Sequence, residues 1–261
     1  MTPRPRLTVP HMHMLTIAIA AALALTAQAG AAEIKVLSGN GGKAAVRELC
    51  AQFERASGHK VTIHFEVNAA LRRKIEAGEP FDVAVLNPPP LDELIKLGKV
   101  DGATRVDIGR AGLGVGVRAG TPKPDVSSLD GFKRTLLAAT KGVAYPREGA
   151  SGIYFASLID RLGIAAEMKD KMRPMPAEDT VEVVARGEAD MVVVVASRIF
   201  DVPGVDLVGP IPAELQTNIG FAAGVSSTAK EPDAARALVK FLSAPERAAT
   251  LTSLGVTPAH R

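Results

Sequence analysis

The 261-residue sequence contains no tryptophan, only 4% of its residues are aromatic, and histidine is scarce. Carbohydrate receptors stack sugar rings on aromatic side chains, above all on Trp. Two of the five histidines, His11 and His13, fall in the first 32 residues, and His260 is at the tail. No HExxH or CxxC motif occurs, and no Ser/His/Asp set has the spacing of a hydrolase. These absences argue against a carbohydrate receptor, a metal site and a catalytic residue set.

Cysteine is represented by one residue, Cys50, so no internal disulfide can form. Cys50 shares helical spacing with the apolar residues Val46, Leu49 and Phe53. A thiol on such a face is predicted to be packed and unreactive. The fold must then be stabilised by its hydrophobic core alone.

Excess charge and long apolar runs are also missing. The chain has 31 basic and 28 acidic residues, with no basic stripe interleaved with aromatics. This composition gives no support to nucleic-acid binding. After the first 32 residues, a run such as Val192–Ala196 is too short to span a membrane and indicates a buried strand.

The N-terminal segment has the pattern of a secretory signal peptide. Arg4 and Arg6 precede an apolar stretch, Leu15–Leu25, and Ala27-Gln28-Ala29 offers a small-x-small cleavage site. A membrane anchor is the alternative, but a spanning helix needs about 20 apolar residues. We expect residues 1–32 to be a signal peptide and the mature protein to be periplasmic.

Strand and helix patterns alternate from residue 34 to the end, which predicts an α/β fold with mostly parallel sheets flanked by helices. We expect two lobes joined by two crossover segments, near residues 115 and 222. Lobe 1 comprises 33–115 and 223–261, and lobe 2 comprises 116–222. The expected strands are 34–37, 61–65, 81–86, 111–117, 142–145, 191–195, 205–208 and 219–225. The expected helices are 42–57, 69–77, 91–97, 129–139, 153–162, 181–185, 232–242 and 245–254.

Two strand-turn-helix segments have turns of small residues that suit anions. Ser38–Gly42 follows the first strand, and Glu148–Gly152 follows the strand that ends at Tyr145. Helix N-termini carry unpaired N–H groups and partial positive charge. No Gly-Lys-Ser/Thr follows the first turn, so it is not a Walker loop. A plain helix cap is the alternative at either turn.

Asn68 and Asn87 each follow a predicted strand and are further candidate donors, or simple helix caps. Pro88–Pro90 are expected to bar helical continuation after Asn87. Arg147 and Arg198 follow predicted strands and can supply positive charge. The predicted ligand-binding residues are Ser38, Gly39, Asn40, Gly41, Asn68, Asn87, Ser151, Gly152 and Thr180. No metal, cofactor or catalytic residue is predicted.

Several segments resemble the molybdate-binding (ModA-like) branch of the type II periplasmic solute-binding proteins. They are Ile34-Lys35-Val36, Leu71–Gly78 followed by Pro80-x-Asp82, Ser151–Tyr154 and Gly187–Asp190. The likeness covers residues 34–254. It implies two lobes that close on a solute by hinge motion and deliver it to an ABC permease.

The resemblance also implies roles for particular positions. The serine that such proteins use after the first strand falls at or near Gly41, and the serine after the second falls at Asn68. The helix N-terminal donor falls at Ser151, and the next donor falls near Thr180. The tyrosine of these proteins aligns at about Val195 and is missing.

We therefore expect a monomeric, non-enzymatic receptor that captures a small oxyanion, molybdate or tungstate first, for an ABC importer. A different anion such as an organic carboxylate, for transport or signalling, is the alternative, and Glu66 near the presumed site would repel a dianion. A hydrolase built around Ser38 or Ser151 is a third hypothesis, disfavoured because no base is visible.

Overall fold

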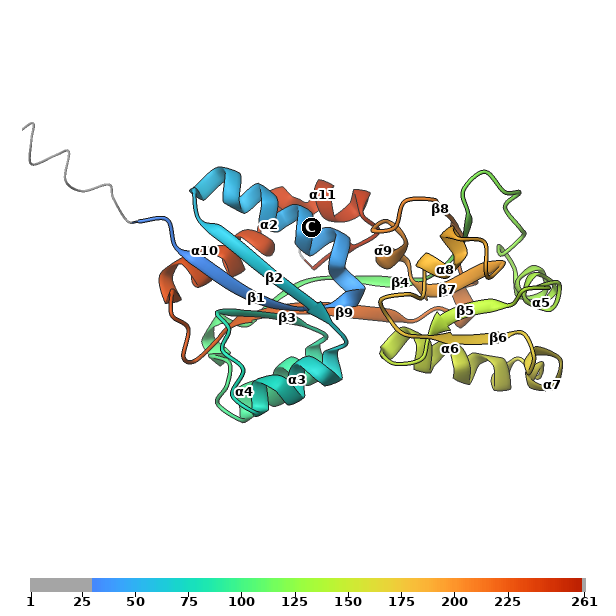
Figure 1. Ribbon diagram of the computed structural model, residues 1–261, viewed down its shortest axis with the longest axis horizontal. Helices are drawn as coiled ribbons and strands as arrows, with labels where there is room; N and C mark the ends of the chain where they lie inside the picture. The colour runs from blue at the N-terminus through green and yellow to red at the C-terminus, as the bar shows by residue number, and fades with distance from the viewer. Residues whose placement is uncertain (1–29, 260–261) are drawn as a thin grey trace, which may run out of the picture. The chain divides into compact units, whose positions relative to one another are not determined.

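Strands and helices alternate along the chain in a computed structural model that describes residues 30–259 (Figure 1). The signal-peptide prediction rests on residues 1–29, which lie outside the described residues, and stays a prediction. Residues Glu33–Arg261 form one unit and are described by themselves. The strands are β1 (Glu33–Gly39), β2 (Lys60–Glu66), β3 (Val83–Leu86), β4 (Val106–Arg118), β5 (Val143–Pro146), β6 (Met172–Met175), β7 (Met191–Val195), β8 (Val205–Pro210), β9 (Asn218–Val225) and β10 (Thr257–Pro258). The α-helices are α2 (Lys43–Ser57), α3 (Asn68–Glu76), α4 (Pro88–Lys96), α5 (Leu129–Leu137), α6 (Ala150–Arg161), α7 (Ala165–Met168), α8 (Glu182–Ala185), α9 (Ala196–Ile199), α10 (Pro232–Leu242) and α11 (Ala248–Ser253). Short 3-10 turns are η1 (Asn40–Gly42), η2 (Gly102–Thr104), η3 (Ala213–Leu215) and η4 (Pro245–Arg247).

The strands follow the order β2-β1-β3-β9-β4-β7-β5-β6, with β8 and β10 also paired to β4. Strands β1, β2 and β3 run parallel, and so do β5, β6 and β7. Between these two groups lie β9 and β4, which pair antiparallel with each other and with β3 and β7. The α/β prediction is confirmed, and β4 and β9 are the strands that join the two parallel groups. The predicted lobe boundaries stay a prediction.

The buried strands explain the apolar runs of the sequence. All residues of β3 and β7 are buried, because helices cover both faces of the sheet. In the first parallel group, α3 and α4 lie on one face, and α2 and α10 lie on the other (Figure 1). The carboxyl ends of β1, β2 and β3 therefore lie at the same edge of the sheet, where each strand continues into a turn and then a helix.

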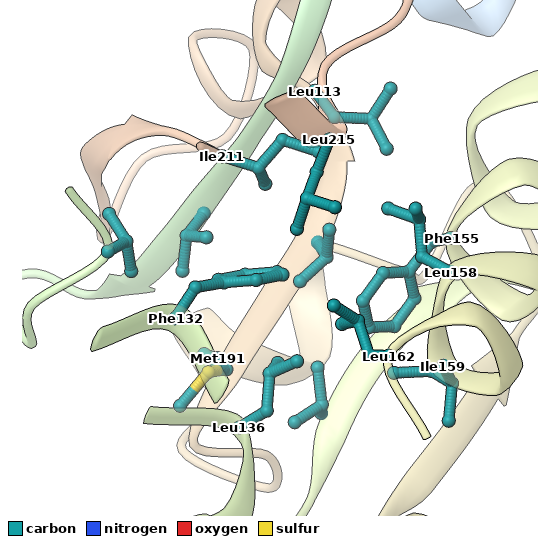
Figure 2. Close-up of a cluster of buried hydrophobic side chains, with 14 of the residues drawn as sticks. Leu113, Phe132, Leu136, Phe155, Leu158, Ile159, Leu162, Met191, Ile211 and Leu215 are labelled. Atoms are coloured by element: carbon teal, nitrogen blue, oxygen red, sulfur yellow. The ribbon is translucent and has the colours of Figure 1, made fainter. Parts of the chain in front are cut away.

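Each parallel group packs on its own apolar core. Leu37, Leu71, Leu86 and Leu91 belong to the core of the first group. In the second group, side chains from α5 and α6 converge, with Phe132 and Phe155 pointing into the same cluster (Figure 2). These cores hold the carboxyl ends of both strand groups in place.

Some predicted elements differ from those observed. Helix α4 begins at Pro88, not after Pro90, because the first helical turn needs no N–H partner and suits the fixed φ of proline. The predicted helix 245–254 is split into η4 and α11. Sequence patterns missed α7, β6, α9 and β10, which are only two to four residues long.

Among residues 30–259, no helix combines the length and apolarity needed to cross a membrane. Within the same range, no three His, Cys, Asp or Glu side chains gather as a metal site would require.

Candidate functional site

A small cavity of about 50 Å³ lies at the carboxyl ends of strands from both parallel groups. In open α/β sheets, ligands bind at this end of the strands. Six strands (β1, β2, β3, β5, β6 and β7) lead into it through the residues that follow them, and the start of β9 completes it. The lining residues are Asn40, Gly41, Val67, Asn68, Asn87, Pro146, Glu148, Gly149, Ala150, Ser151, Ala177, Val194, Val195, Arg198 and Ile219.

Three helix beginnings meet at this cavity: η1 leading into α2, α3 and α6. None of the three has a side-chain cap. In α6, the first N–H bonded inside the helix is that of Ile153, which donates to the Gly149 carbonyl at 3.1 Å. The N–H groups of Ala150 and Ser151 therefore remain for a ligand. Unpaired N–H groups and the positive ends of three helix dipoles favour an anion here.

Helix α4 also begins at the cavity, but it contributes no such donors. Its first three residues are Pro88–Pro90, which have no backbone N–H. At this corner the donors are therefore side chains. Asn68 Nδ2 donates to Asn87 Oδ1 at 2.8 Å, and Asn87 Nδ2 donates to the Gly220 carbonyl at 2.7 Å. Each amide group has two N–H bonds, so one on each remains for a ligand.

Glycines let the backbone approach at two points of the site. Gly149, which precedes α6, has φ = 98°, a left-handed conformation that favours glycine. A Cβ on Gly39 would lie 2.9 Å from the Asn68 amide, so the β1 end accepts the Asn68 side chain only because no Cβ is there. Gly149 thus positions the N–H groups at the start of α6, and Gly39 positions the Asn68 amide.

Arg198 gives the cavity a buried cation. It follows β7 on α9 and is only 2% exposed. Its terminal nitrogens lie 2.6 Å from Glu182 Oε1 and 3.5 Å from Asp201 Oδ2. Its Nε is buried and has no hydrogen-bond partner among the described residues. A buried, unsatisfied N–H costs about 1–3 kcal/mol, and more when it is charged, so an anion that accepts from it gains that energy.

Ion pairs and one hydrogen bond tie α9 to the first strand group. Asp201, with a side chain 5% exposed, pairs with Arg47 and, at 3.4 Å, with Lys43. The Ser197 hydroxyl donates to the Gly41 carbonyl at 2.6 Å. These contacts position Arg198 beside the η1 turn.

The structure brings together five of the predicted binding residues: Asn40, Gly41, Asn68, Asn87 and Ser151. That they bind a ligand stays a prediction. Ser151 is the second residue of α6 and follows the N-cap Gly149. The residues that do not line the cavity are Ser38, Gly39, Gly152 and Thr180.

Packing accounts for three of these four residues, all but Gly39. Ser38 is fully buried and its hydroxyl donates to the adjacent Gly39 carbonyl at 3.3 Å. Thr180 is fully buried and donates to the Pro176 carbonyl at 2.8 Å. Gly152 packs on β5, where a Cβ would lie 1.7 Å from the Pro146 carbonyl oxygen. All three therefore support the cavity from behind its wall.

Glu66, expected near the site, is not among the lining residues. Its carboxylate lies 2.5 Å from Lys74 Nζ and 3.0 Å from His64 Nε2. The hydrogen bond from Lys74 lowers the pKa of Glu66. The repulsion expected from Glu66 is thus offset by its own ion pairs.

Glu148 lines the cavity but was not among the ligand-binding residues predicted from the sequence. Arg198 was named only together with Arg147, as two possible sources of positive charge. No local sequence signal ranks Arg198 above Arg147, because Arg147 directly follows β5 and Arg198 lies three residues after the end of β7. Arg147 is exposed, and its guanidinium donates to the Pro174 carbonyl at 3.2 Å. Val195, at the position where the resemblance implied a tyrosine, lines the cavity, so this wall is apolar.

The cavity adjoins a wider groove of about 640 Å³. Shared lining residues, among them Asn68, Asn87 and Glu148, connect the two spaces. The groove adds Arg72, Arg73, Glu76 and Glu93 from α3 and α4. Arg72 pairs with Glu76 at 2.7 Å and with Glu93. The site therefore has a small buried end and a larger open end.

Comparison with known proteins identifies the family. Residues 34–257 match the family described as bacterial extracellular solute-binding protein. The molybdate-binding protein ModA of Escherichia coli is 25% identical over 82% of this chain and 84% of its own. The solved molybdate-binding protein of Azotobacter vinelandii has the same fold, with a TM-score of 0.73, 18% identity, and 86% and 98% of the two chains covered.

A further relative corrects one expectation. A protein of Pseudomonas sp. named aconitate isomerase is 35% identical over 86% of this chain and 87% of its own. The prediction of a non-enzymatic protein is contradicted by this likeness, because an isomerase is an enzyme. An isomerase needs neither a hydrolase residue set nor a metal-binding motif, so the absence of these motifs from the sequence did not exclude an enzyme. The chain belongs to the bacterial extracellular solute-binding proteins, and its predicted resemblance to their ModA-like members is confirmed.

Proposed function

We propose that the cavity binds a small organic polycarboxylate, aconitate or a close analogue, and that the protein interconverts its geometric isomers. The observation that carries the proposal is Arg198, a buried guanidinium with an unpartnered Nε at a cavity where three helix N-termini meet. A hydrogen bond from a guanidinium to a carboxylate is charge-assisted, and the Nε–H of Arg198 is left for it because the terminal nitrogens already face Glu182 and Asp201. The 35% identical aconitate isomerase supplies the reaction class.

The two-part shape of the site supports a ligand larger than one anionic group. The inner cavity, about 50 Å³, has room for one carboxylate, while the groove of about 640 Å³ accommodates the remainder of a tricarboxylate. Arg73 lines that groove and forms no ion pair among the described residues. Aconitate carries three carboxylates on a three-carbon unsaturated chain, so it offers anions to both ends.

The proposal is tested by incubating the purified protein with cis- or trans-aconitate and following both isomers by proton NMR. We expect each isomer to be converted toward the same equilibrium mixture. Calorimetry with aconitate, citrate, molybdate, tungstate, sulfate and phosphate reports binding separately. Absence of isomerisation with both isomers would overturn the enzymatic proposal, whatever the binding result.

Arg198→Met tests whether the buried guanidinium with its unpartnered Nε binds the ligand. Loss of a charge-assisted hydrogen bond costs about 1.5–3 kcal/mol, so the affinity for aconitate should fall roughly 10- to 150-fold. Arg198→Lys keeps the charge but loses Nε, and should bind with intermediate affinity. Arg147→Met is the matched control, because Arg147 is exposed and does not line the cavity. Thermal melts of all three variants separate a binding loss from unfolding.

The second candidate function is the capture of molybdate or tungstate for an ABC permease, as a monomeric periplasmic receptor. It is favoured by the small inner cavity and the neutral donors at the helix N-termini, which suit a compact oxyanion. The 25% identical ModA supports it as well. In the same calorimetric series, tight binding of molybdate and tungstate without aconitate binding would select this function.

A further inference from the structure

We propose that Glu148 is the catalytic residue that takes and returns the proton during isomerisation. The inference rests on the proposed function and deepens it. Isomerising an unsaturated tricarboxylate requires the double bond to be broken and formed again. A proton shift does this without an oxidant, a reductant or a second substrate. The question is then which side chain moves the proton.

Glu148 lies where the inner cavity opens into the groove. It stands in the turn between the end of β5 at Pro146 and the start of α6 at Ala150. It lines both the cavity and the groove. Its carboxylate has no hydrogen bond or ion pair among the described residues. A ligand with one carboxylate beside Arg198 and the rest in the groove passes Glu148 at its carbon chain.

The other ionisable residues of the site are poor proton carriers. Arg72, Arg73 and Arg198 stay protonated, because the guanidinium pKa is far above neutrality. In the groove, the carboxylates of Glu76 and Glu93 are engaged by Arg72. No His, Lys, Tyr or Cys lines either space among the described residues. Glu148 is therefore the ionisable residue lining these two spaces that can carry the proton.

Thiol addition to the double bond is not available at this site. The one cysteine, Cys50, lies buried on α2, and burial raises the pKa of its thiol to about 12. It does not line the cavity or the groove. A route through a thiol adduct therefore lacks its nucleophile, and proton transfer is the route that uses a group lining both spaces.

In the proposed step, Glu148 accepts a proton from the methylene carbon of aconitate as that C–H bond breaks. The electron pair spreads over the three-carbon allylic unit and its carboxylates. The protonated Glu148 then returns the proton to the carbon that was the far end of the double bond. The former single bond becomes the new double bond, and the conformer held by the site sets its geometry. No net change in charge or oxidation state results.

The donors of the site assist the first half of the step, in which the ligand loses its proton. The guanidinium of Arg198 and the N–H groups at the start of α6 stabilise negative charge as it develops on the ligand. These donors are in place before the reaction, so they need no rearrangement.

Glu148→Gln is the direct test, because it keeps the shape and removes the base. We expect turnover to fall at least about 100-fold, within the 10²–10⁴-fold range of general acid–base catalysis. The calorimetric affinity for aconitate should change less than 10-fold. Glu148→Asp keeps a carboxylate and should retain more activity than Glu148→Gln. Glu167→Gln, which removes an exposed carboxylate on α7, is the matched control and should be as active as the parent.

A solvent-isotope readout distinguishes a proton carrier from a structural residue. In D₂O the parent protein should incorporate deuterium into aconitate, and Glu148→Gln should not. Retention of more than a tenth of the parent turnover by a folded Glu148→Gln protein would overturn the assignment. Loss of aconitate binding in this variant would also overturn it, in favour of a binding role. Absence of turnover and exchange in the parent itself would instead overturn the proposed function, and this inference with it.

Discussion

Gly152 is a residue whose lack of a side chain positions the candidate site. The α6 backbone approaches β5 so closely that a Cβ at Gly152 would lie 1.7 Å from the Pro146 carbonyl oxygen. Both atoms belong to the main chain, so neither can turn away as a side chain would. The N–H groups at the start of α6 depend on this close approach.

We therefore expect Gly152→Ala to lower the free energy of unfolding by about 1–3 kcal/mol, the usual cost of overpacking, or by more. The α6 N-terminus would also shift away from the cavity and weaken anion binding. Urea denaturation and calorimetry measure the two effects. Ser157→Ala, on the exposed side of the same helix, should stay within about 0.5 kcal/mol of the parent. Equal stability of the two variants would show that α6 is not held by this contact.

Cys50 provides a second prediction at the residue scale. The side chain is 2% exposed, and burial, followed by the nearby charge of Glu54, raises the pKa of its thiol to about 12. The folded protein should react with a thiol reagent only as fast as it unfolds. Because the thiol ionises near pH 9.0 when unfolded, the free energy of unfolding should fall as pH rises from about 9 to about 12. Cys50→Ala should lack this thiol-dependent part of the pH dependence.

Five of the nine predicted binding residues line the cavity, and each of them lies in a turn or helix start that follows a strand. Asn68 and Asn87 line the cavity, as the rule that ligands bind at strand carboxyl ends led us to expect, and their contact with a ligand stays a prediction. Ser38 is also close in sequence to the cavity, but both faces of β1 are covered at this end of the strand, and Ser38 is fully buried there. Sequence distance to a turn therefore does not determine which side chains reach a site.

At the scale of elements, α9 is the short helix that connects the two strand groups around the site. It has only four residues, so no periodic pattern could reveal it. Asp201, two residues after α9, pairs with Arg198 of α9. It also pairs with Lys43 and Arg47, which belong to α2. The charge at the cavity thus depends on contacts between elements about 150 residues apart in sequence.

Asp201→Asn should therefore destabilise the protein and disturb the cavity together. Removing one partner of a buried ion pair costs on the order of 3–5 kcal/mol, because the other charge stays buried. Here Glu182 still pairs with Arg198, so the lower end of this range is expected. Denaturant unfolding gives the stability change. Asp233→Asn, which breaks a fully exposed pair with Arg236, should have no measurable effect.

At the scale of elements, long and well-patterned segments were predicted well. Strand β7 and helix α10 have the predicted bounds, because continuous apolar residues and an initial proline mark them clearly. Helix α4 was predicted to begin three residues too late, because three consecutive prolines were interpreted as a barrier and not as a first turn. The consequence is functional, since these prolines remove the N–H donors of α4 from the cavity.

At the scale of the whole molecule, a ligand held between two strand groups should stabilise the fold. Ligand at 100 times its dissociation constant contributes about 2.7 kcal/mol. For a domain of this size, each kcal/mol raises Tm by roughly 2–4 °C. Aconitate should thus raise Tm by about 5–10 °C in the parent and clearly less in Arg198→Met. An equal rise in both proteins would place the ligand outside this cavity.

The family resemblance also predicts hinge closure about β4 and β9, with lobe boundaries near residues 115 and 222. Both strands pass between the two parallel groups. Small-angle scattering should then show a smaller radius of gyration with bound ligand than without it. An unchanged radius, measured where calorimetry shows saturation, would contradict closure.

The sequence by itself determined the α/β class, the order of its long elements, the buried thiol and the likeness to solute-binding proteins. These properties follow from patterns of apolar residues, prolines and glycines that are local in the sequence and do not depend on contacts between distant segments. Only the tertiary structure decided which polar residues meet. It placed Arg198 and Glu148 at one cavity with Asn68 and Asn87, and it turned Ser38 and Thr180 into the core. The physical reason is that burial, ion pairs and side-chain direction depend on contacts between segments distant in sequence.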